Sequence, residues 1–85
     1  MPELPEINKR VKILIEDYAN GNVTRFVKQI DFKQSQKVNR LFLIDKRSQK
    51  FPLVSTEIIM AICNRYPVNL NWLFTGESAK LKETD

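Results

Sequence analysis

Apolar residues recur every three or four positions over most of the chain, a spacing that places them on one face of an α-helix. The longest such segment covers residues 5–19, and its apolar face contains Ile7, Val11, Leu14, Ile15 and Tyr18, opposite Lys9, Lys12 and Glu16. Ile13 falls outside this face and is expected to be partly exposed. Asn20 and Gly21 follow, and both tolerate the left-handed conformation in which helices often end. The pattern therefore predicts a helix over residues 5–19.

Two shorter helices are predicted in the middle of the chain, over residues 23–30 and 34–43. Asn22 is a suitable N-cap for the first, and residues 31–33 are expected to form the turn between them. The apolar faces contain Val23, Phe26, Val27 and Ile30 in the first helix, and Val38, Leu41 and Phe42 in the second. Arg25, Lys28 and Gln29 are expected to face outward from the first helix. Residues 41–44 also suit a strand, but the helical phase on both sides disfavours one.

The last third of the chain predicts two further helices, over residues 56–66 and 70–75. Ser55 and Asn69 are suitable N-caps. Pro67 and Gly76 mark the two ends, since proline disfavours helical geometry in the residue before it. Trp72 is expected in the core because apolar residues surround it at helical spacing. We therefore expect an all-α fold, a compact five-helix domain over residues 1–76, with residues 77–85 as a tail or the start of a linker.

Composition argues against catalysis and metal binding. A chain of 85 residues builds one small domain with little room for a deep pocket. It has no histidine and a single cysteine, Cys63, so neither a Cys/His zinc site nor an intrachain disulfide is possible. The chain shows no paired carboxylates, glycine-rich phosphate loop, membrane-length apolar run or secretory signal. We expect no enzyme activity, no cofactor, no metal and a cytoplasmic location.

Positive charge is concentrated in one part of the chain. Residues 22–50 contain eight basic and two acidic side chains, a net charge of +6, whereas the remainder has six basic and eight acidic ones, a net charge of −2. A neutral-to-acidic body with one basic stretch is typical of proteins that bind a polyanion. A solvated, lysine-rich surface is the alternative interpretation of the charge alone.

The segment 34–43 combines an apolar side with a side of amides and cations. Its polar side chains are Gln34, Ser35, Gln36, Asn39 and Arg40, and it has no acidic residue. An α-helix fits the major groove of DNA, where glutamine and asparagine can pair with adenine and arginine with guanine. On its own the segment is also compatible with a solvated helix face. Together with the neighbouring cations, it favours a DNA-reading helix.

Two stretches resemble the lambda-repressor-like family of helix-turn-helix domains, which includes Cro and the phage repressors. One is residues 22–30, Asn-Val-Thr-Arg-Phe-Val-Lys-Gln-Ile, followed by the glutamine-containing segment. The other, Val-Asn-Leu-Asn-Trp-Leu-Phe-Thr-Gly-Glu at 68–77, is similar to the Asn-Trp-Leu-Leu-Thr-Gly-Glu ending common in phage-repressor-like proteins of Bacteroides-type bacteria. Residues 41–47, with Lys50-Phe51-Pro52 after them, are also similar to that subgroup. The resemblance covers roughly residues 5–82 and implies a lambda-repressor-like fold.

The resemblance implies sequence-specific binding of double-stranded DNA by a transcriptional regulator, a repressor of phage or mobile-element origin, that reads the major groove with its third helix. The implied base-reading residues are Gln34, Ser35, Gln36, Asn39 and Arg40. The implied phosphate-contacting residues are Thr24, Arg25, Lys28, Lys33, Lys37, Lys46, Arg47 and Lys50. It also implies a homodimer on DNA, weak or monomeric without it, with a contact near Phe74, Glu77 and Lys80.

Three departures from the family pattern bear on this assignment. Asp31 stands where the family usually has glycine, and Val27 where it often has alanine. The interval from Ile30 to Val38 is one residue longer than usual, so the base-reading positions shift by up to one residue at the start of the helix.

The alternative function is a protein-interaction domain on the same scaffold, such as an antitoxin, because fold alone does not set function.

Overall fold

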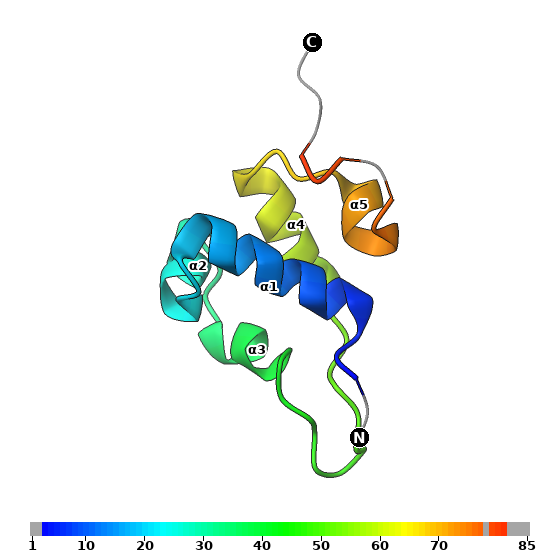
Figure 1. Ribbon diagram of the computed structural model, residues 1–85. Coiled ribbons are helices and arrows are strands. Elements are labelled where there is room, and N and C mark those ends of the chain that lie inside the picture. The colour runs from blue at the N-terminus through cyan, green and yellow to red at the C-terminus, as the bar shows by residue number, and fades with distance from the viewer. Residues whose placement is uncertain (1–2, 78, 82–85) are drawn as a thin grey trace.

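The computed structural model describes residues 3–77 and 79–81, and this part of the chain forms five α-helices joined by short connections (Figure 1). The helices are α1 (Glu6–Ala19), α2 (Val23–Gln29), α3 (Ser35–Arg40), α4 (Thr56–Arg65) and α5 (Leu70–Thr75). Extended pairing in these residues is limited to two isolated bridges, Asp45 with Lys50 and Val68 with Leu81. The predicted all-α class is therefore confirmed.

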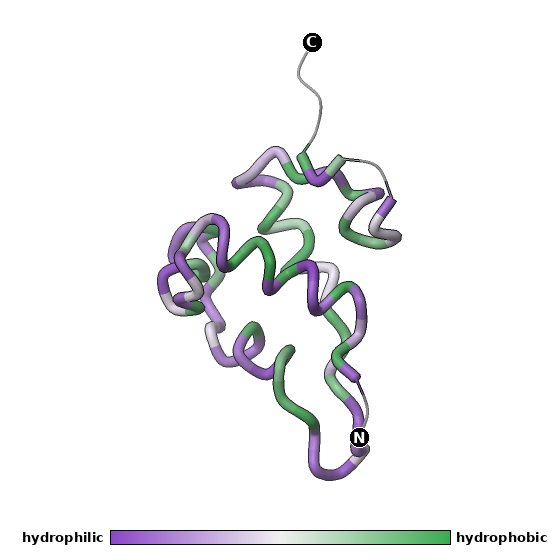
Figure 2. Tube along the Cα trace, viewed as in Figure 1, coloured by the Kyte–Doolittle hydropathy of each residue, from purple (hydrophilic) through white to green (hydrophobic). Residues whose placement is uncertain are grey.

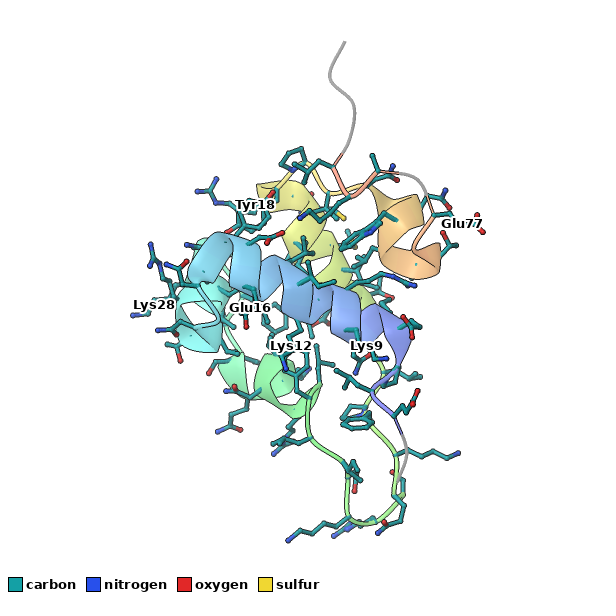
Figure 3. All side chains as sticks on the ribbon, in the orientation of Figure 1. Lys9, Lys12, Glu16, Tyr18, Lys28 and Glu77 are labelled. Carbon is teal, nitrogen blue, oxygen red and sulfur yellow. The ribbon has the colours of Figure 1, made fainter. Side chains whose placement is uncertain are left out.

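Helix α1 lies across the other helices and supplies one wall of the core (Figure 1). Val11, Leu14 and Ile15 are buried, whereas Ile13 is 43% exposed, as the helical phase predicts. Figure 3 shows Lys9, Lys12 and Glu16 projecting from α1. The helix ends where Asn20 (φ 53°) and Gly21 (φ 81°) take up the left-handed conformation, which confirms the predicted stop.

Helix α2 begins with the predicted cap, because Asn22 Oδ1 accepts the backbone N–H of Arg25 at 3.0 Å. Phe26, Val27 and Ile30 are buried as expected. The prediction that Gln29 faces outward is wrong. Its side chain is half-buried and donates to the Tyr18 carbonyl at 3.1 Å, while its Oε1 accepts the Tyr66 hydroxyl. Gln29 faces inward because two tyrosines from α1 and the end of α4 meet beside α2.

Helix α3 is shorter than predicted and ends at Arg40 rather than at residue 43. Beyond it the backbone tightens, because the N–H groups of Leu41, Phe42 and Leu43 each donate to the carbonyl three residues earlier. The carbonyl of Leu41 accepts a hydrogen bond from the side chain of Asn8 on α1. The segment that follows α3 is thereby joined to α1, a contact that periodicity could not reveal.

Helix α5 begins and ends where the sequence predicts, and α4 begins at the predicted residue but ends at Arg65, one residue earlier than predicted. Ser55 Oγ accepts the N–H of Ile58 at 3.3 Å, and Asn69 Oδ1 accepts the N–H of Asn71 at 2.9 Å. Tyr66, before Pro67, is extended (φ −125°, ψ 150°), and Gly76 ends α5 at φ 77°. Trp72 is expected in the core, but it is half-buried and packs on the core's edge, while Leu73 beside it is fully buried.

The core contains buried apolar side chains from all five helices. The apolar stretches of α1 and α4 lie toward the centre of the molecule, whereas the projecting tip of the connection between α3 and α4 is hydrophilic (Figure 2). None of the helices described is long and apolar enough to cross a membrane. In residues 3–77 and 79–81, no group of three or more Cys, Asp or Glu side chains could hold a metal ion.

Part of the expected tail returns to the domain. Leu81 pairs with Val68, and the N–H of Asn69 donates to the Lys80 carbonyl at 3.0 Å. The Lys80 ammonium group forms an ion pair with Asp17 on α1. Residues 79–81 therefore lie against α1 and the start of α5, whereas residues 78 and 82–85 of the predicted tail lie outside the described residues.

Candidate nucleic-acid interface

The position of α3 is set by one buried residue of the helix and one just beyond it. Val38 is fully buried and Leu41 is 1% exposed, so this side of the segment is fixed against the core. The opposite side is then directed to solvent by the helical phase. Gln36 and Arg40 lie on that side, and Gln34, Lys37 and Asn39 are exposed as well. Ser35 is half-buried, so it differs from the other four residues that the sequence predicts to read bases.

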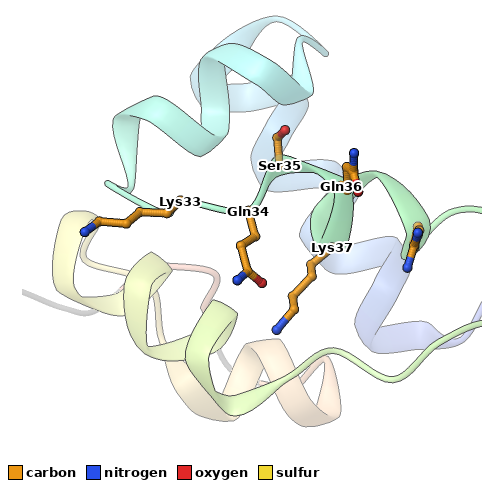
Figure 4. A pocket seen from close by; sticks show the side chains of 6 residues that line it. Lys33, Gln34, Ser35, Gln36 and Lys37 are labelled. Carbon is orange, nitrogen blue, oxygen red and sulfur yellow. The ribbon is translucent and has the colours of Figure 1, made fainter.

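These side chains surround an open hollow of about 360 Å³, lined by Lys33, Gln34, Ser35, Gln36, Lys37 and Arg40. Figure 4 shows Gln34 and Lys37 extending to the same side, whereas the hydroxyl of Ser35 points to the opposite side. Asn39 is exposed but does not line this hollow. The structure therefore brings together Gln34, Gln36 and Arg40 with two residues predicted to contact phosphate; Ser35 also lines the hollow, but with its hydroxyl turned away, and Asn39 lies outside it.

All eight residues predicted to contact phosphate are exposed. Thr24, Arg25 and Lys28 lie on α2, and Figure 3 shows Lys28 projecting outward from the molecule. Lys33 and Lys37 flank the start of α3. The remaining three, Lys46, Arg47 and Lys50, belong to the connection between α3 and α4. The predicted set thus occupies surface segments before, within and after α3.

None of these cations is neutralised by an ion pair in the part of the chain that the structure describes. The ion pairs found there join Lys9 and Arg10 to Glu6, and Lys80 to Asp17. Glu6 and Asp17, both on α1, thus pair with cations outside the 22–50 segment. The positive charge around α3 remains available to an external anion.

The cations at residues 46 and 47 lie on a turn closed by its own hydrogen bonds, which we call the basic loop (residues 45–50). The Asp45 N–H donates to the Lys50 carbonyl at 2.8 Å, and Asp45 Oδ1 accepts the Arg47 N–H at 2.8 Å. Gln49, with φ 60°, donates through its side chain to the Lys46 carbonyl at 2.8 Å. The basic loop projects beyond α3 (Figure 1). These internal bonds hold the shape of the loop itself.

Sequence reasoning misses the structural role of Asp45 and Gln49 in this loop. By charge alone, Asp45 is only one of two acids in a basic segment. Its side chain accepts an N–H two residues further on, a turn that aspartate forms readily. An aspartate at the start of a short polar loop is the signal that could have indicated it.

An aromatic cluster fixes the orientation of α2 relative to α1 and α4. The rings of Tyr18 and Tyr66 stack with centroids 3.9 Å apart, and the Phe26 ring lies 6.0 Å from that of Tyr66. Burial raises the pKa of Tyr66 above the ordinary 10.0, while the nearby charges of Arg65 and Arg25 act in the opposite direction. The Arg65 guanidinium also lies over the Tyr66 ring, 5.6 Å from its centroid. The cluster thereby holds the helix that carries three of the residues predicted to contact phosphate.

Comparisons with family models, with curated proteins and with solved structures found no match to this chain. A function for it is therefore argued from the residues and geometry described above.

Proposed function

We propose that this chain is a sequence-specific DNA-binding domain of a transcriptional repressor, in which α2, the turn and α3 form a helix-turn-helix unit. One observation carries the proposal. The exposed side of α3 presents two amides and a guanidinium, on Gln34, Gln36 and Arg40, with unpaired cations around them. Amides and guanidinium groups suit base edges in the major groove, and surrounding cations suit phosphates.

The short length of α3 agrees with this use. Six residues make a helix about 9 Å long, which can contact only a few base pairs. The side chains of its first turn are then the ones nearest the base edges, as in helix-turn-helix docking. Gln36 and Arg40 lie one turn apart on the exposed side, so they are suited to adjacent positions of one half-site. Gln34, at the N-cap, is suited to the outer edge of the same half-site.

The first experiment is a salt titration of binding to duplex DNA. Each phosphate neutralised by a lysine or arginine should contribute about −0.9 to the slope of log K against log salt concentration. We expect a linear decrease with a slope corresponding to several phosphates. Lys12→Ala, on the exposed side of α1 and outside the 22–50 segment, serves as the control and should leave the slope unchanged. An affinity that does not change with salt would contradict the proposal.

The second experiment separates base reading from phosphate contact. Gln36→Ala and Arg40→Ala should each cost roughly 1–3 kcal/mol on the preferred site and relax base preference at one position. Lys46→Ala and Arg47→Ala should weaken all sequences about equally. Binding-site selection on random DNA, repeated with each variant, measures both effects. If the loop variants change base preference and the α3 variants do not, α3 is not the reading helix.

The DNA-bound form is proposed to contain two copies of the chain. Leu70 and Phe74 lie one turn apart on α5 and are 45% and 55% exposed, which leaves an uncovered apolar strip on a short helix. Pairing two domains on half-sites lengthens the site that helix-turn-helix proteins read. Sedimentation with an operator-sized duplex should show two chains per duplex. Phe74→Ser should reduce this to one, while Leu53→Ser, at an 84% exposed site outside α5, should not.

The alternative, a protein-interaction domain such as an antitoxin, is favoured by a different surface. The turn after α2 and the outer side of α4 enclose an open hollow that includes Phe32 and Met60, with Asp31 and Glu57 at its edge. Met60 is 58% exposed, and the residues that line the hollow include no lysine or arginine. A protein partner retained at salt concentrations that abolish DNA binding, and lost in Met60→Glu, would favour this alternative.

A further inference from the structure

Asn8, on α1, is the one buried polar residue among those described, and it is fully inaccessible to solvent. Its side-chain nitrogen donates to two backbone carbonyls, that of Leu41 at 2.7 Å and that of Pro52 at 3.0 Å. These partners lie 33 and 44 residues further along the chain. One amide group therefore joins α1 to two distant points of the backbone.

The two carbonyls stand on either side of the basic loop. Leu41 follows the last residue of α3, and Pro52 lies two residues after Lys50. The loop between them is closed by its own hydrogen bonds, which determine its shape. The direction in which the loop points from the domain depends instead on how its two ends are held. Leu41 itself is packed in the core, but the residues next to the loop are less well held, since Leu43 is 63% and Leu53 is 84% exposed. The contacts of Asn8 are thus well placed to set the direction of the loop.

The acceptor side of the same amide is unsatisfied. Asn8 Oδ1 is buried and has no hydrogen-bond partner in the described part of the chain. Buried polar atoms are almost always paired, because an unpaired one costs the free energy of removing it from water. That cost offsets much of what the two donated bonds contribute to stability. A contribution to stability alone therefore accounts poorly for an asparagine at this position. The feature of asparagine that the structure requires is a nitrogen with two N–H groups, which bonds both carbonyls at once.

We infer that Asn8 is a positioning residue for the proposed DNA interface: it sets the basic loop at a fixed distance from α3, so that Arg40 and the loop cations contact the same duplex together. The inference rests on the proposed function for its consequence in binding. Its structural part, the fixing of the loop by Asn8, can be measured without DNA.

The binding test uses Asn8→Leu, which keeps a similar volume but removes both donors and the unsatisfied acceptor. If the loop no longer holds its position, the negative slope of log K against log salt should become shallower by about 0.9 for each phosphate that the loop cations cease to neutralise. Adding Lys46→Ala to Asn8→Leu should then change the slope no further. Adding Lys28→Ala, on α2, should still make the slope shallower by about 0.9. A general decrease in stability would not produce this selective non-additivity.

Two controls accompany this test. Ile15→Val changes another buried position of α1 that has no polar side-chain atom, and it should leave the salt slope at the wild-type value. If Asn8→Leu does not fold, Asn8→Ser keeps one donor, which can bond at most one of the two carbonyls, and the same shallower slope is expected. A folded Asn8 variant with the wild-type slope, and with full additivity to Lys46→Ala, would overturn the inference while leaving the proposed function intact.

The fixing of the basic loop by Asn8 is tested by attaching spin labels to two introduced cysteines, Lys9→Cys on α1 and Arg47→Cys in the loop. The native cysteine is removed by Cys63→Ser, so that only these two sites are labelled. Both labelled positions are exposed. The distance distribution should be narrow in the otherwise unchanged chain and broad with Asn8→Leu. An unchanged distribution would refute the positioning role whether or not the chain binds DNA. Failure of the wild-type chain to bind any duplex would instead refute the proposed function.

Discussion

Gly76 joins two independent constraints at the end of α5, and this makes Gly76→Ala a quantitative test of the structure. Its backbone has φ 77°, and its N–H closes the helix on the Trp72 carbonyl at 2.8 Å. A Cβ at this position would lie 2.6 Å from the Arg10 Nη2 atom. Arg10 is held there because its Nη1 donates to the Leu73 carbonyl at 3.1 Å. The substitution therefore strains the backbone and displaces a bonded side chain.

The two contributions can be worked out separately. A non-glycine residue in the left-handed conformation costs about 1 kcal/mol. Displacing Arg10 removes its hydrogen bond to Leu73, worth about 1 kcal/mol net. Its ion pair with Glu6 at 3.8 Å adds little, because Glu6 is largely exposed. The expected decrease in unfolding free energy is about 2 kcal/mol, or a decrease in Tm of roughly 8–16 °C for a domain of this size.

Gly21→Ala is the matched control. Gly21 also has positive φ, 81°, but its Cβ would meet only the Glu16 carboxylate at 3.2 Å, the free end of an exposed side chain. It should cost about 1 kcal/mol, from backbone strain alone. Urea unfolding of both variants, each also in an Arg10→Met background, measures the difference. Equal destabilisation by the two substitutions, or an excess at Gly76 that persists without Arg10, would refute the reasoning.

Three further predictions concern the core, a cap and pH. Leu73→Ala should destabilise the fold by about 2–5 kcal/mol, and Trp72→Ala by less because Trp72 is half-buried; the reverse order in thermal unfolding would contradict the described packing. Asn22→Ala should cost about 1 kcal/mol in urea unfolding because α2 then lacks its cap, and an unchanged stability would contradict the cap. The pKa of Tyr66 is raised in the folded state, so its contribution to stability is complete below pH 10 and is lost as pH rises through the folded-state pKa. Tyr66→Phe should reduce this alkaline destabilisation in urea unfolding measured between pH 9 and about 12, and an identical pH dependence would contradict it.

The helix boundaries that sequence predicts well are those fixed by local chemistry. The caps at Asn22, Ser55 and Asn69 each bond to an N–H two or three residues away, and the stop at Asn20 depends on its own backbone conformation. These interactions involve near neighbours in the chain, so residue type and spacing suffice to identify them. For the same reason the buried face of α1 follows directly from the helical period.

The exposure of the predicted site residues was also foreseeable in large part. Positions opposite a buried apolar stripe face solvent, which is why Gln36 and Arg40 are exposed, and the predicted phosphate contacts outside the helices lie in polar connections. Ser35, at the start of the helix, departs from the expectation and is half-buried. The uncompensated charge around α3 likewise followed from the scarcity of acids in residues 22–50.

Only the tertiary structure decided the inward side of Gln29, the edge position of Trp72 and the contacts of Asn8. Each depends on partners far along the chain: Gln29 contacts Tyr18 and Tyr66, and Asn8 contacts Leu41 and Pro52. Helical periodicity assigns a side chain to a face, but it carries no information about which backbone carbonyl another helix will bring to that face. The partners of these long-range hydrogen bonds depend on how the apolar stripes pack. Local sequence therefore determines the helices and their faces, while the packed core selects where each polar side chain finds its partner.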